Sequence, residues 1–468
     1  MRLIAYMKPY AHWVIFALLL VLGLTAFDLY RPMLVGDAID TFGANGDYDV
    51  IIATAIKYAV VLALSFAFNI AQTWILQKTG QNIILQMRKD LYRHIQSLGS
   101  RYFDITPVGK LVTRVTNDVE ALNEMYSGIL VQLFRNIVKI VGLAGVMLVL
   151  DVRLAAISFV LMPLVIGLTV LCQKIARNIY RLYRTRLTDI NTFLSEHLSG
   201  MKIIQIFGRQ ERKFEEFHDK NTKLYKAFYR EMLMYAVFRP LIYILSILSL
   251  MIVLWFGSRN VFDEIISVGT LYIFSNYIRS FFDPIQELAE QFSTLQSSIA
   301  SAEKIFTVMD EDEFIPEVEN PKQPDKITGK IEFDHVWFAY DGENYVLKDV
   351  SFVINPGEKV AFVGATGAGK SSILNLIGRY YDIQKGHIYI DGIDIRQLSK
   401  KQLRSAIGQM QQDVFIFEGD VAYNIRLNDD NITDAQVKAA AEYVNASHFI
   451  EKLPQGYHEP VTERGSTF

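Results

Sequence analysis

A glycine-rich segment, KVAFVGATGAGKSSILNLI at residues 359–377, carries the residues best suited to chemistry. The β-branched run Val360–Val363 predicts a strand that enters a glycine turn at residues 364–369, and an amphipathic helix is expected to open at Lys370. Backbone N–H groups of such a turn converge on anionic oxygens, and the helix N-terminus adds a partial positive charge. Lys370 supplies a mobile cation, and the Ser371 hydroxyl suits Mg²⁺. The spacing therefore predicts a phosphate cradle that binds a nucleotide.

The apolar residues of the chain are not spread evenly. The 468 residues are 51% hydrophobic with a net charge of -3. Long hydrophobic runs extend to about Gln291, whereas short strands and helices of ordinary charge are expected from Lys330 onward. We predict a membrane domain at 1–308, an acidic, proline-containing linker at 309–328 that tethers the halves without a core of its own, and a soluble domain at 329–468. Lys and Arg clusters lie beside membrane spans, which gives no case for nucleic acid as a partner.

Six apolar stretches are each about the 20 residues that a bilayer core requires. They are predicted to be membrane spans at residues 12–34, 51–76, 127–150, 154–172, 236–256 and 268–288. Only the residues 151–153 separate the third and fourth spans, which predicts a tight turn. Long polar segments follow the second and fourth spans and keep a helical apolar period. We therefore expect these membrane helices to continue beyond the bilayer.

Basic residues indicate the orientation. The segment 173–235 is rich in Lys and Arg, whereas the loop after the first span carries Asp37, Asp40, Asp47 and Asp49. By the positive-inside rule, the N-terminus, both long segments and the nucleotide-binding domain face the cytoplasm. The first span lacks a small-residue cleavage site, which favours an uncleaved span over a signal peptide. We predict a multi-pass protein of the inner (cytoplasmic) membrane, in contact with membrane lipid.

Shorter patterns predict local structure in both halves. Alternation of apolar residues at 329–340 and 346–354 predicts two antiparallel strands. Thr433 and Gln436 have the spacing of a capping box, which predicts a helix.

The single cysteine, Cys172, is interpreted as a small apolar packing residue. The eight histidines show no ligand spacing, so we expect no metal site built by this chain alone.

With these features the chain resembles half-transporters of the ATP-binding cassette (ABC) exporter family, of the multidrug or lipid-exporter type. The fold class implied is an α-helical membrane domain of six transmembrane helices with long cytoplasmic extensions, followed by an incomplete α/β P-loop ATPase domain. Tyr340, in VWFAY, matches the aromatic residue that stacks on adenine; the other interpretation is a strand aromatic packed in a sheet. Gln412, in IGQMQQDVFIF, matches the glutamine that contacts Mg²⁺ and water, although Gln411 stands where the family has a proline.

Two segments of the membrane half resemble the coupling segments of the family. In the first, at 102–119, the matching residues are Phe103, Asp104, Gly109, Leu111, Thr113, Arg114 and Asp118. In the second, at 195–211, they are Glu196, Leu198, Gly200, Ile204, Gln205, Phe207 and Glu211. Each segment alone is also compatible with a solvated helix face. Together with the phosphate loop they extend the resemblance over essentially the whole chain.

The resemblance implies a dimer, either a homodimer or a heterodimer with a related second half-transporter, which sandwiches ATP and Mg²⁺. Lys370 and the backbone amides of residues 367–370 would hold the phosphates, Ser371 and Gln412 the Mg²⁺, and Tyr340 the adenine. Lys370 and Gln412 are expected to take part in catalysis. The general base of the family is expected to be absent from this chain. The expected site residues are Tyr340, Gly364, Gly367, Ala368, Gly369, Lys370, Ser371, Ser372 and Gln412.

The function implied is ATP-driven export of a small hydrophobic or amphiphilic, drug-like substrate. Export of lipid or peptide and a non-hydrolysing regulatory half of a heterodimer are the alternatives. A membrane-tethered kinase or GTPase is disfavoured, because nothing near the phosphate loop resembles its catalytic segments. Aromatic residues of the sixth span, at 272–282, either face a cavity or serve packing. Asp28 and Lys139 lie in or near spans, where a charge either has a function, pairs with another helix or reaches an interface.

The sequence as given ends at TERGSTF, where the resemblance implies that the signature sequence begins at about Phe468. The acidic strand, the glutamate that acts as general base and the switch histidine of the family would follow it. We therefore expect a truncated copy that binds ATP weakly and does not hydrolyse it at a rate typical of the family.

Overall fold

The computed structural model describes residues 2–46, 48–410, 415–427 and 429–462. The chain divides into two compact units, Met1–Phe314 and Ile315–Phe468, which we name the membrane unit and the nucleotide unit. The division falls inside the predicted linker at 309–328. The domain bounds inferred from sequence stay predictions.

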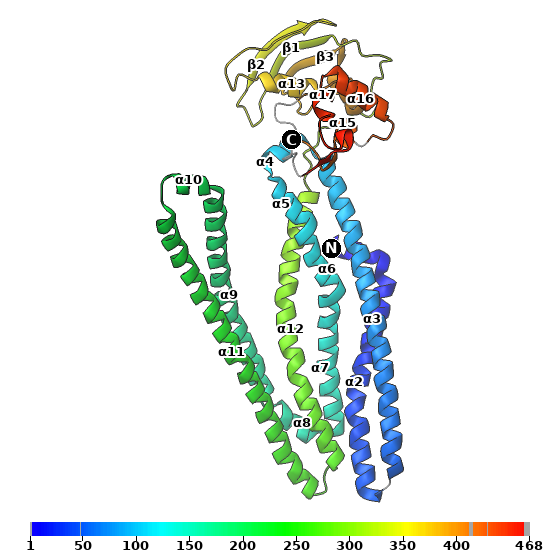
Figure 1. Ribbon diagram of the computed structural model, residues 1–468. Helices are drawn as coiled ribbons and strands as arrows, with labels where there is room; N and C mark the ends of the chain where they lie inside the picture. The colour runs from blue at the N-terminus through cyan, green and yellow to red at the C-terminus, as the bar shows by residue number, and fades with distance from the viewer. Residues whose placement is uncertain (1, 47, 411–414, 428, 463–468) are drawn as a thin grey trace. The chain divides into compact units, whose positions relative to one another are not determined.

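The membrane unit is helical throughout its regular elements, over the residues that are described. Its α-helices are α1 (Arg2–Met7), α2 (Ala11–Asn45), α3 (Tyr48–Ser97), α4 (Ser100–Ile105), α5 (Val108–Thr113), α6 (Val119–Glu124), α7 (Leu130–Leu150), α8 (Val152–Phe159), α9 (Met162–Ser199), α10 (Met201–Ile206), α11 (Gln210–Phe262) and α12 (Val268–Met309). Two π-helical turns flank α6, at Arg114–Asp118 and Met125–Ile129. In Figure 1, α2 lies beside α3, and α9 lies beside α11 with α10 joining them at one end.

Five helical runs in the described residues are long and apolar enough to cross a membrane. They are Arg2–Gly43, Tyr48–Ser97, Val108–Leu150, Val152–Ser199 and Gln210–Phe262, and they contain the first five predicted spans. The sixth predicted span, residues 268–288, lies in α12, which is helical but is not among those five runs. The count of six therefore stays a prediction.

The long polar segments that follow the second and fourth spans are helical, as predicted. α3 runs without a break from Tyr48 to Ser97, and α11 from Gln210 to Phe262. The turn at 151–153 is also confirmed, because α7 ends at Leu150 and the Asp151 carboxylate accepts a hydrogen bond from Leu154 N at 2.6 Å. This bond caps the next helix.

The fourth predicted span is not one continuous helix. α8 ends at Phe159, a turn follows, and α9 begins at Met162 with Pro163 in its first turn. Proline has no N–H to donate, and the first turn of a helix is the position where it fits best. The span predicted at 154–172 lies within the apolar run Val152–Ser199, and this turn lies inside it.

Much of the apolar surface of the membrane unit faces outward. Only 11% of the most apolar stretch of α3 is buried, and Leu62, Phe66 and Trp74 of that helix are exposed. In water such a surface would be unfavourable, but it matches a bilayer. One buried core lies along α7, α8, α9, α11 and α12, where Phe274 and Tyr277 are almost inaccessible, and another joins the second half of α3 to α6 and α12.

The nucleotide unit contains a four-stranded sheet of order β2-β1-β3-β4, in which the paired strands are antiparallel. Its strands are β1 (Ile331–Phe338), β2 (Leu347–Ile354), β3 (Lys385–Ile390) and β4 (Ile393–Asp394), and a separate pair is β5 (Gly419–Asp420) with β6 (Pro460–Val461). The predicted pairing of the two segments at 329–340 and 346–354 is confirmed, with Ile331 opposite Ile354. Apolar residues of β1 and β3 form one core with the buried face of α13 (Lys370–Ile377), so the sheet supports the helix that begins at Lys370.

The strand predicted at Val360–Val363 is absent from the described structure. No strand is assigned to these residues, and Val363 is 95% exposed. A strand requires a partner that takes up its backbone hydrogen bonds, and none of the described strands pairs with this run. The β-branched composition of this run was therefore insufficient to predict a strand.

The remaining helices of the nucleotide unit are short. They are α14 (Lys400–Ser405), α15 (Val421–Arg426), α16 (Asp434–Tyr443) and α17 (Ser447–Ile450). The capping box predicted at Thr433 is confirmed, because its hydroxyl accepts from Gln436 N while Gln436 Oε1 accepts from Thr433 N at 2.8 Å. These two bonds satisfy donors at the start of α16.

Candidate functional site

The phosphate loop depends on glycine at two positions. Gly367 and Gly369 have φ angles of 86° and 89°, which only glycine adopts without strain. Gly369 caps α13, and a Cβ at this position would lie 2.7 Å from Leu347 Cδ2 on β2. No side chain caps the first turn of α13, so its N–H groups are suited to bind an anion.

The Lys370 side chain folds back over the loop. Its ammonium group donates hydrogen bonds to the carbonyl oxygens of Gly364 and Ala365, each at 2.8 Å. An ammonium has three donors and a flexible stem. Binding of a phosphate would therefore exchange these bonds for stronger bonds to an anion, which is the behaviour expected of a mobile cation.

Tyr340 lies next to the phosphate-loop helix. Its hydroxyl is 3.0 Å from Ser372 Oγ, and its ring meets Phe338 and Tyr381 edge to face, with centroids 4.7 and 5.0 Å away. Ser372 is only 4% exposed, so its hydroxyl faces the tyrosine from inside the unit. The structure thus brings Tyr340 to α13, and its predicted contact with adenine stays a prediction.

The predicted Mg²⁺ ligands are only partly described. Ser371 is exposed in the first turn of α13 beside Lys370. A hydroxyl oxygen at this position fits Mg²⁺, which prefers oxygen ligands and commonly bridges to phosphate. Gln412 lies outside the described residues, as does Gln411. The catalytic and metal roles of Lys370, Ser371 and Gln412 stay predictions.

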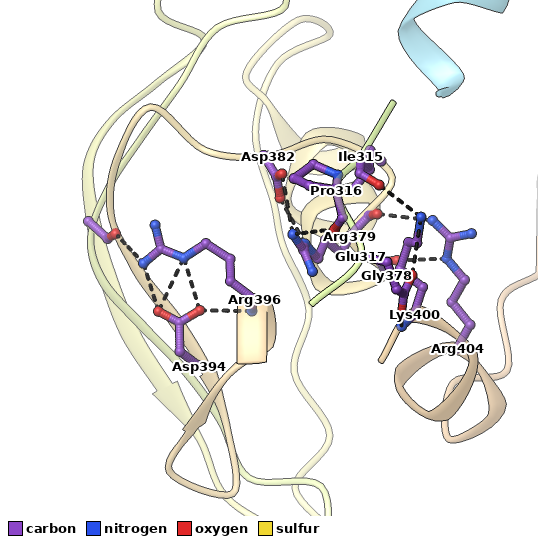
Figure 2. Close-up of polar contacts among 11 residues, drawn as sticks. Ile315, Pro316, Glu317, Gly378, Arg379, Asp382, Asp394, Arg396, Lys400 and Arg404 are labelled. Carbon is purple, nitrogen blue, oxygen red and sulfur yellow. Dashed lines mark hydrogen bonds and ion pairs between the residues drawn. The ribbon is translucent and has the colours of Figure 1, made fainter. Parts of the chain in front are cut away.

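The C-terminal end of α13 is held by a buried arginine. The Arg379 side chain is 4% exposed, its Nε donates to Asp382 Oδ1 at 2.9 Å, and its Nη2 donates to the Pro316 carbonyl at 3.2 Å. Arg404 donates to the carbonyl oxygens of Gly378 and Arg379 at 3.2 and 3.0 Å (Figure 2). These bonds satisfy carbonyls at the end of the helix. The orientation of the phosphate-loop helix therefore depends on both arginines.

The predicted linker is not free along its whole length. Lys400 Nζ donates to the Ile315 carbonyl at 2.8 Å and forms an ion pair with Glu317 at 3.2 Å (Figure 2). Gln402 Nε2 donates to the Pro324 carbonyl at 3.0 Å. The prediction of a simple tether therefore missed these contacts, since no local pattern indicates them. Arg379 was also missed; the only local signal was a glycine, Gly378, at the end of an amphipathic helix.

A second polar cluster stabilises the far edge of the sheet. Burial by itself would raise the pKa of the Asp394 carboxyl, but hydrogen bonds from Arg396 and His387 outweigh burial and lower the pKa to about 2. Arg396 Nη2 lies 2.7 Å from Asp394 Oδ2, and His387 Nδ1 lies 2.9 Å from the same oxygen. The carboxylate also accepts from Arg396 N, which orders the turn after β4. This cluster is structural, because it fixes backbone rather than facing the phosphate loop.

The membrane unit contains a cavity of about 650 Å³. Its wall combines aromatic and charged residues from α6, α9, α11 and α12, among them Tyr180, Phe238, Arg177, Glu124 and Glu290. Thr169 also lines the cavity, is 3% exposed, and its Oγ1 has no hydrogen-bond partner among the described residues. A wall of this type suits a compound with both apolar and polar parts.

The two predicted coupling segments differ in structure. In the first, Arg114 forms an ion pair with the buried Asp118, which accepts a hydrogen bond from Ser301 Oγ on α12 at 2.8 Å. These residues therefore tie the segment to its own unit. In the second, α10 is a short exposed helix, and Ile206 and Phe207 are 69% and 71% exposed.

Comparison with known proteins matches both units. The family model described as the ABC transporter transmembrane region matches residues 14–285, and the model described as ABC transporter matches residues 347–461. The chain is 37% identical to the Streptococcus pneumoniae protein exp8, named as an ABC transporter ATP-binding protein, over 100% of this chain and 80% of that protein. It is 36% identical to Bacillus subtilis YheH, named as a multidrug resistance ABC transporter ATP-binding/permease protein, over 88% of this chain and 61% of YheH.

A third relative is the Mycobacterium tuberculosis protein named as a fatty acid ABC transporter ATP-binding/permease protein. It is 34% identical over 87% of this chain and 65% of that protein. The phosphate loop, the apolar helical runs and these matches agree. The chain belongs to the ABC transporter family, as a multi-pass exporter half-transporter that joins a membrane unit to an ATP-binding unit in one polypeptide and works as part of a dimer.

Proposed function

We propose that the chain exports a hydrophobic or amphiphilic, drug-like compound across the cytoplasmic membrane, from the cytoplasmic side. The observation that supports this most directly is the cavity in the membrane unit, whose wall places Tyr180 and Phe238 near charged residues. Aromatic surface receives the apolar part of a ligand, and a few polar groups orient it. Thr169, buried without a partner among the described residues, supplies one such polar group.

In this proposal the nucleotide unit binds ATP at the loop before α13. Backbone N–H groups from Gly367 to Lys370 and the Lys370 ammonium hold the phosphates, while Ser371 and Gln412 hold Mg²⁺. Bound Mg²⁺ would neutralise charge on the phosphates. The Tyr340 ring would stack on adenine, which requires that its packing against Tyr381 leaves one face accessible. ATP drives the transport cycle because it binds one conformation of the dimer more tightly than the other.

Lipid export is the second candidate. The name of the Mycobacterium tuberculosis relative refers to fatty acids, and the arginine-containing cavity described below favours an anionic amphiphile. A regulatory half that binds ATP without turnover is a third alternative, supported by no particular contact. Homodimer and heterodimer are both compatible with the half-transporter architecture.

Lys370→Ala tests the nucleotide part of the proposal. Removing the ammonium should abolish ATP-dependent dye uptake into inverted membrane vesicles and weaken binding of a fluorescent ATP analogue, while membrane insertion stays normal. Lys359→Ala is the matched control, because Lys359 is exposed and precedes the loop. Normal transport by Lys370→Ala would contradict the assignment.

Phe238→Ala tests the cavity. The loss of an aromatic wall should raise the dye concentration needed for half-maximal transport, while binding of the ATP analogue stays unchanged. Trp255→Ala serves as the control, since Trp255 is an aromatic residue of the same helix that is 75% exposed and does not line the cavity. Equal effects of the two substitutions would argue against this cavity as the substrate site.

A further inference from the structure

Four polar side chains from three helices meet within the predicted membrane spans. Asp28 and Arg31 lie on α2, Ser65 on α3 and Arg135 on α7. Asp28 forms ion pairs with Nη2 of Arg31 at 2.9 Å and with Nη2 of Arg135 at 3.3 Å. Arg31 Nη2 also donates to the Ser65 hydroxyl at 3.0 Å. Asp28 is thus paired with another helix, one of the options that the sequence left open.

This arginine cluster does not balance its own charge. Two guanidinium groups share one carboxylate, so the cluster has one excess positive charge. Arg31 Nε is fully buried and has no hydrogen-bond partner among the described residues. An unbalanced charge and an unsatisfied donor are both costly in the hydrocarbon region of a membrane. A bound anion would relieve the unbalanced charge.

The cluster lines a cavity of about 560 Å³ between α2, α3 and α7. The wall beside the charges is apolar and includes Leu24, Leu62 and Phe66. Leu62 and Phe66 are 51% and 69% exposed, so this wall faces outward from the unit. A cationic group beside an outward apolar wall fits a ligand that has a negative head group and an acyl chain.

We propose that this cavity binds the anionic head group of an amphiphile that enters from the bilayer. Arg31 and Arg135 bind the carboxylate or phosphate, for which the planar guanidinium group is well suited, and the chain lies along Leu62 and Phe66. A small soluble anion would leave the apolar wall uncovered. The inference rests on the proposed function in that it assigns a charge to the exported amphiphile, but binding at this site requires no ATP.

Native mass spectrometry of the full chain, in neutral detergent without ATP, tests the binding. The probes are oleate with its neutral counterpart methyl oleate, and phosphatidylglycerol with phosphatidylcholine. One favourable arginine contact corresponds to a preference of about fivefold for the anionic member of a pair. Preference for oleate alone identifies a fatty acid as the source, and preference for phosphatidylglycerol identifies a membrane phospholipid. Equal binding within both pairs overturns the proposal.

Three substitutions are expected to change the preference for the anionic lipid, two in one direction and one in the other. Arg31→Gln and Arg135→Gln should each lower the preference about fivefold, whereas Asp28→Asn should increase it by removing the competing carboxylate. A cluster that only supports folding would lose binding in all three variants. Arg153→Gln is the matched control. It removes the same charge from an exposed position in the first turn of α8. A loss of binding in Asp28→Asn, or an equal loss in Arg153→Gln, overturns the proposal.

The same samples separate this site from the nucleotide site. Each variant is also tested for binding of a fluorescent ATP analogue and for its elution volume in size-exclusion chromatography. Normal nucleotide binding with lost lipid preference in Arg31→Gln and Arg135→Gln supports the proposal. Failure of nucleotide binding in the unaltered chain counts against the proposed function. The lipid preference then decides by itself whether the arginine cluster binds an anionic head group.

Discussion

The nucleotide unit and the membrane unit build their candidate sites in different ways. The phosphate loop uses backbone N–H groups and one lysine from a short continuous segment, ending in α13. The arginine cluster instead joins Asp28, Ser65 and Arg135 from three helices. A site made of backbone is visible in the local sequence, because the glycines that permit it are adjacent. A site made of side chains from separate helices depends on packing.

Glycine shows the same difference in another form. Gly369 is required in the phosphate loop by its own positive φ angle and by the nearby Leu347. Gly269, at the start of α12, has helical geometry and is required only by its neighbours: a Cβ would overlap the Gly36 carbonyl oxygen and the Asp40 carboxylate. One glycine is needed for local backbone shape and the other for close contact between helices.

The largest effect is expected for Gly369→Ala. A residue with a Cβ is strained at this φ angle and would meet Leu347, at a cost of about 1–3 kcal/mol. Binding of a fluorescent ATP analogue should weaken roughly tenfold to a hundredfold. Gly408→Ala is the control, because a Cβ there meets nothing within 4 Å. Unchanged binding by Gly369→Ala would mean that the loop conformation is not needed.

Gly269→Ala should destabilise the membrane unit. The added methyl group forces α12 away from α2 and breaks the bond from Gly269 N to Asp40 Oδ1, which is 2.7 Å long. Overpacking of this kind costs about 1–3 kcal/mol. The midpoint of thermal unfolding in detergent, followed by size-exclusion chromatography, measures it. Gly145→Ala on α7, where a Cβ meets nothing within 4 Å, should change little; equal shifts would show that the close helix contact is unimportant.

Arg379→Ala should destabilise the nucleotide unit by about 1–2 kcal/mol. The substitution removes the bonds to Asp382 and to the Pro316 carbonyl. It should also weaken nucleotide binding indirectly, because α13 loses a support at its C-terminal end. Trp337 fluorescence during denaturation in urea reports the change, and Lys401→Ala, at an exposed position, is the control. A normal unfolding midpoint for Arg379→Ala would show that the linker contacts contribute little.

The smallest effect expected is a dependence of the nucleotide unit's stability on pH. The pKa of Asp394 is lowered from 3.8 to about 2, so the folded state binds its proton less readily than the unfolded state. The stabilisation is complete above about pH 4 and is lost as the pH falls toward 2. Asp391 and Glu317 also have lowered pKa values, so they act in the same direction.

Unfolding of the nucleotide unit between pH 6 and pH 2, followed by Trp337 fluorescence, measures this contribution. Asp394→Asn should be less stable at pH 6 and should show a shallower decline on acidification than the unaltered chain. Parallel curves for the two proteins would exclude Asp394 as a source of the dependence.

Several local patterns were sufficient to predict structure. The capping box at Thr433, the turn at Asp151 and the pairing of β1 with β2 were predicted correctly, because each is decided by residues close in sequence or by simple alternation. The strand at Val360–Val363 was wrong, since strand formation needs a partner. The turn between α8 and α9 inside the fourth span was not predicted, because hydropathy does not register the break before Pro163.

By itself, the sequence determined the family, the succession of an apolar half and a nucleotide-binding half, and the position of the phosphate loop. These follow from composition and from adjacent residues. The tertiary structure decided that Asp28 pairs with Arg135, that Ser372 faces Tyr340, and that Lys400 holds the linker. Each of these contacts joins residues far apart in the chain, and their meeting depends on how helices and strands pack, which no local spacing records.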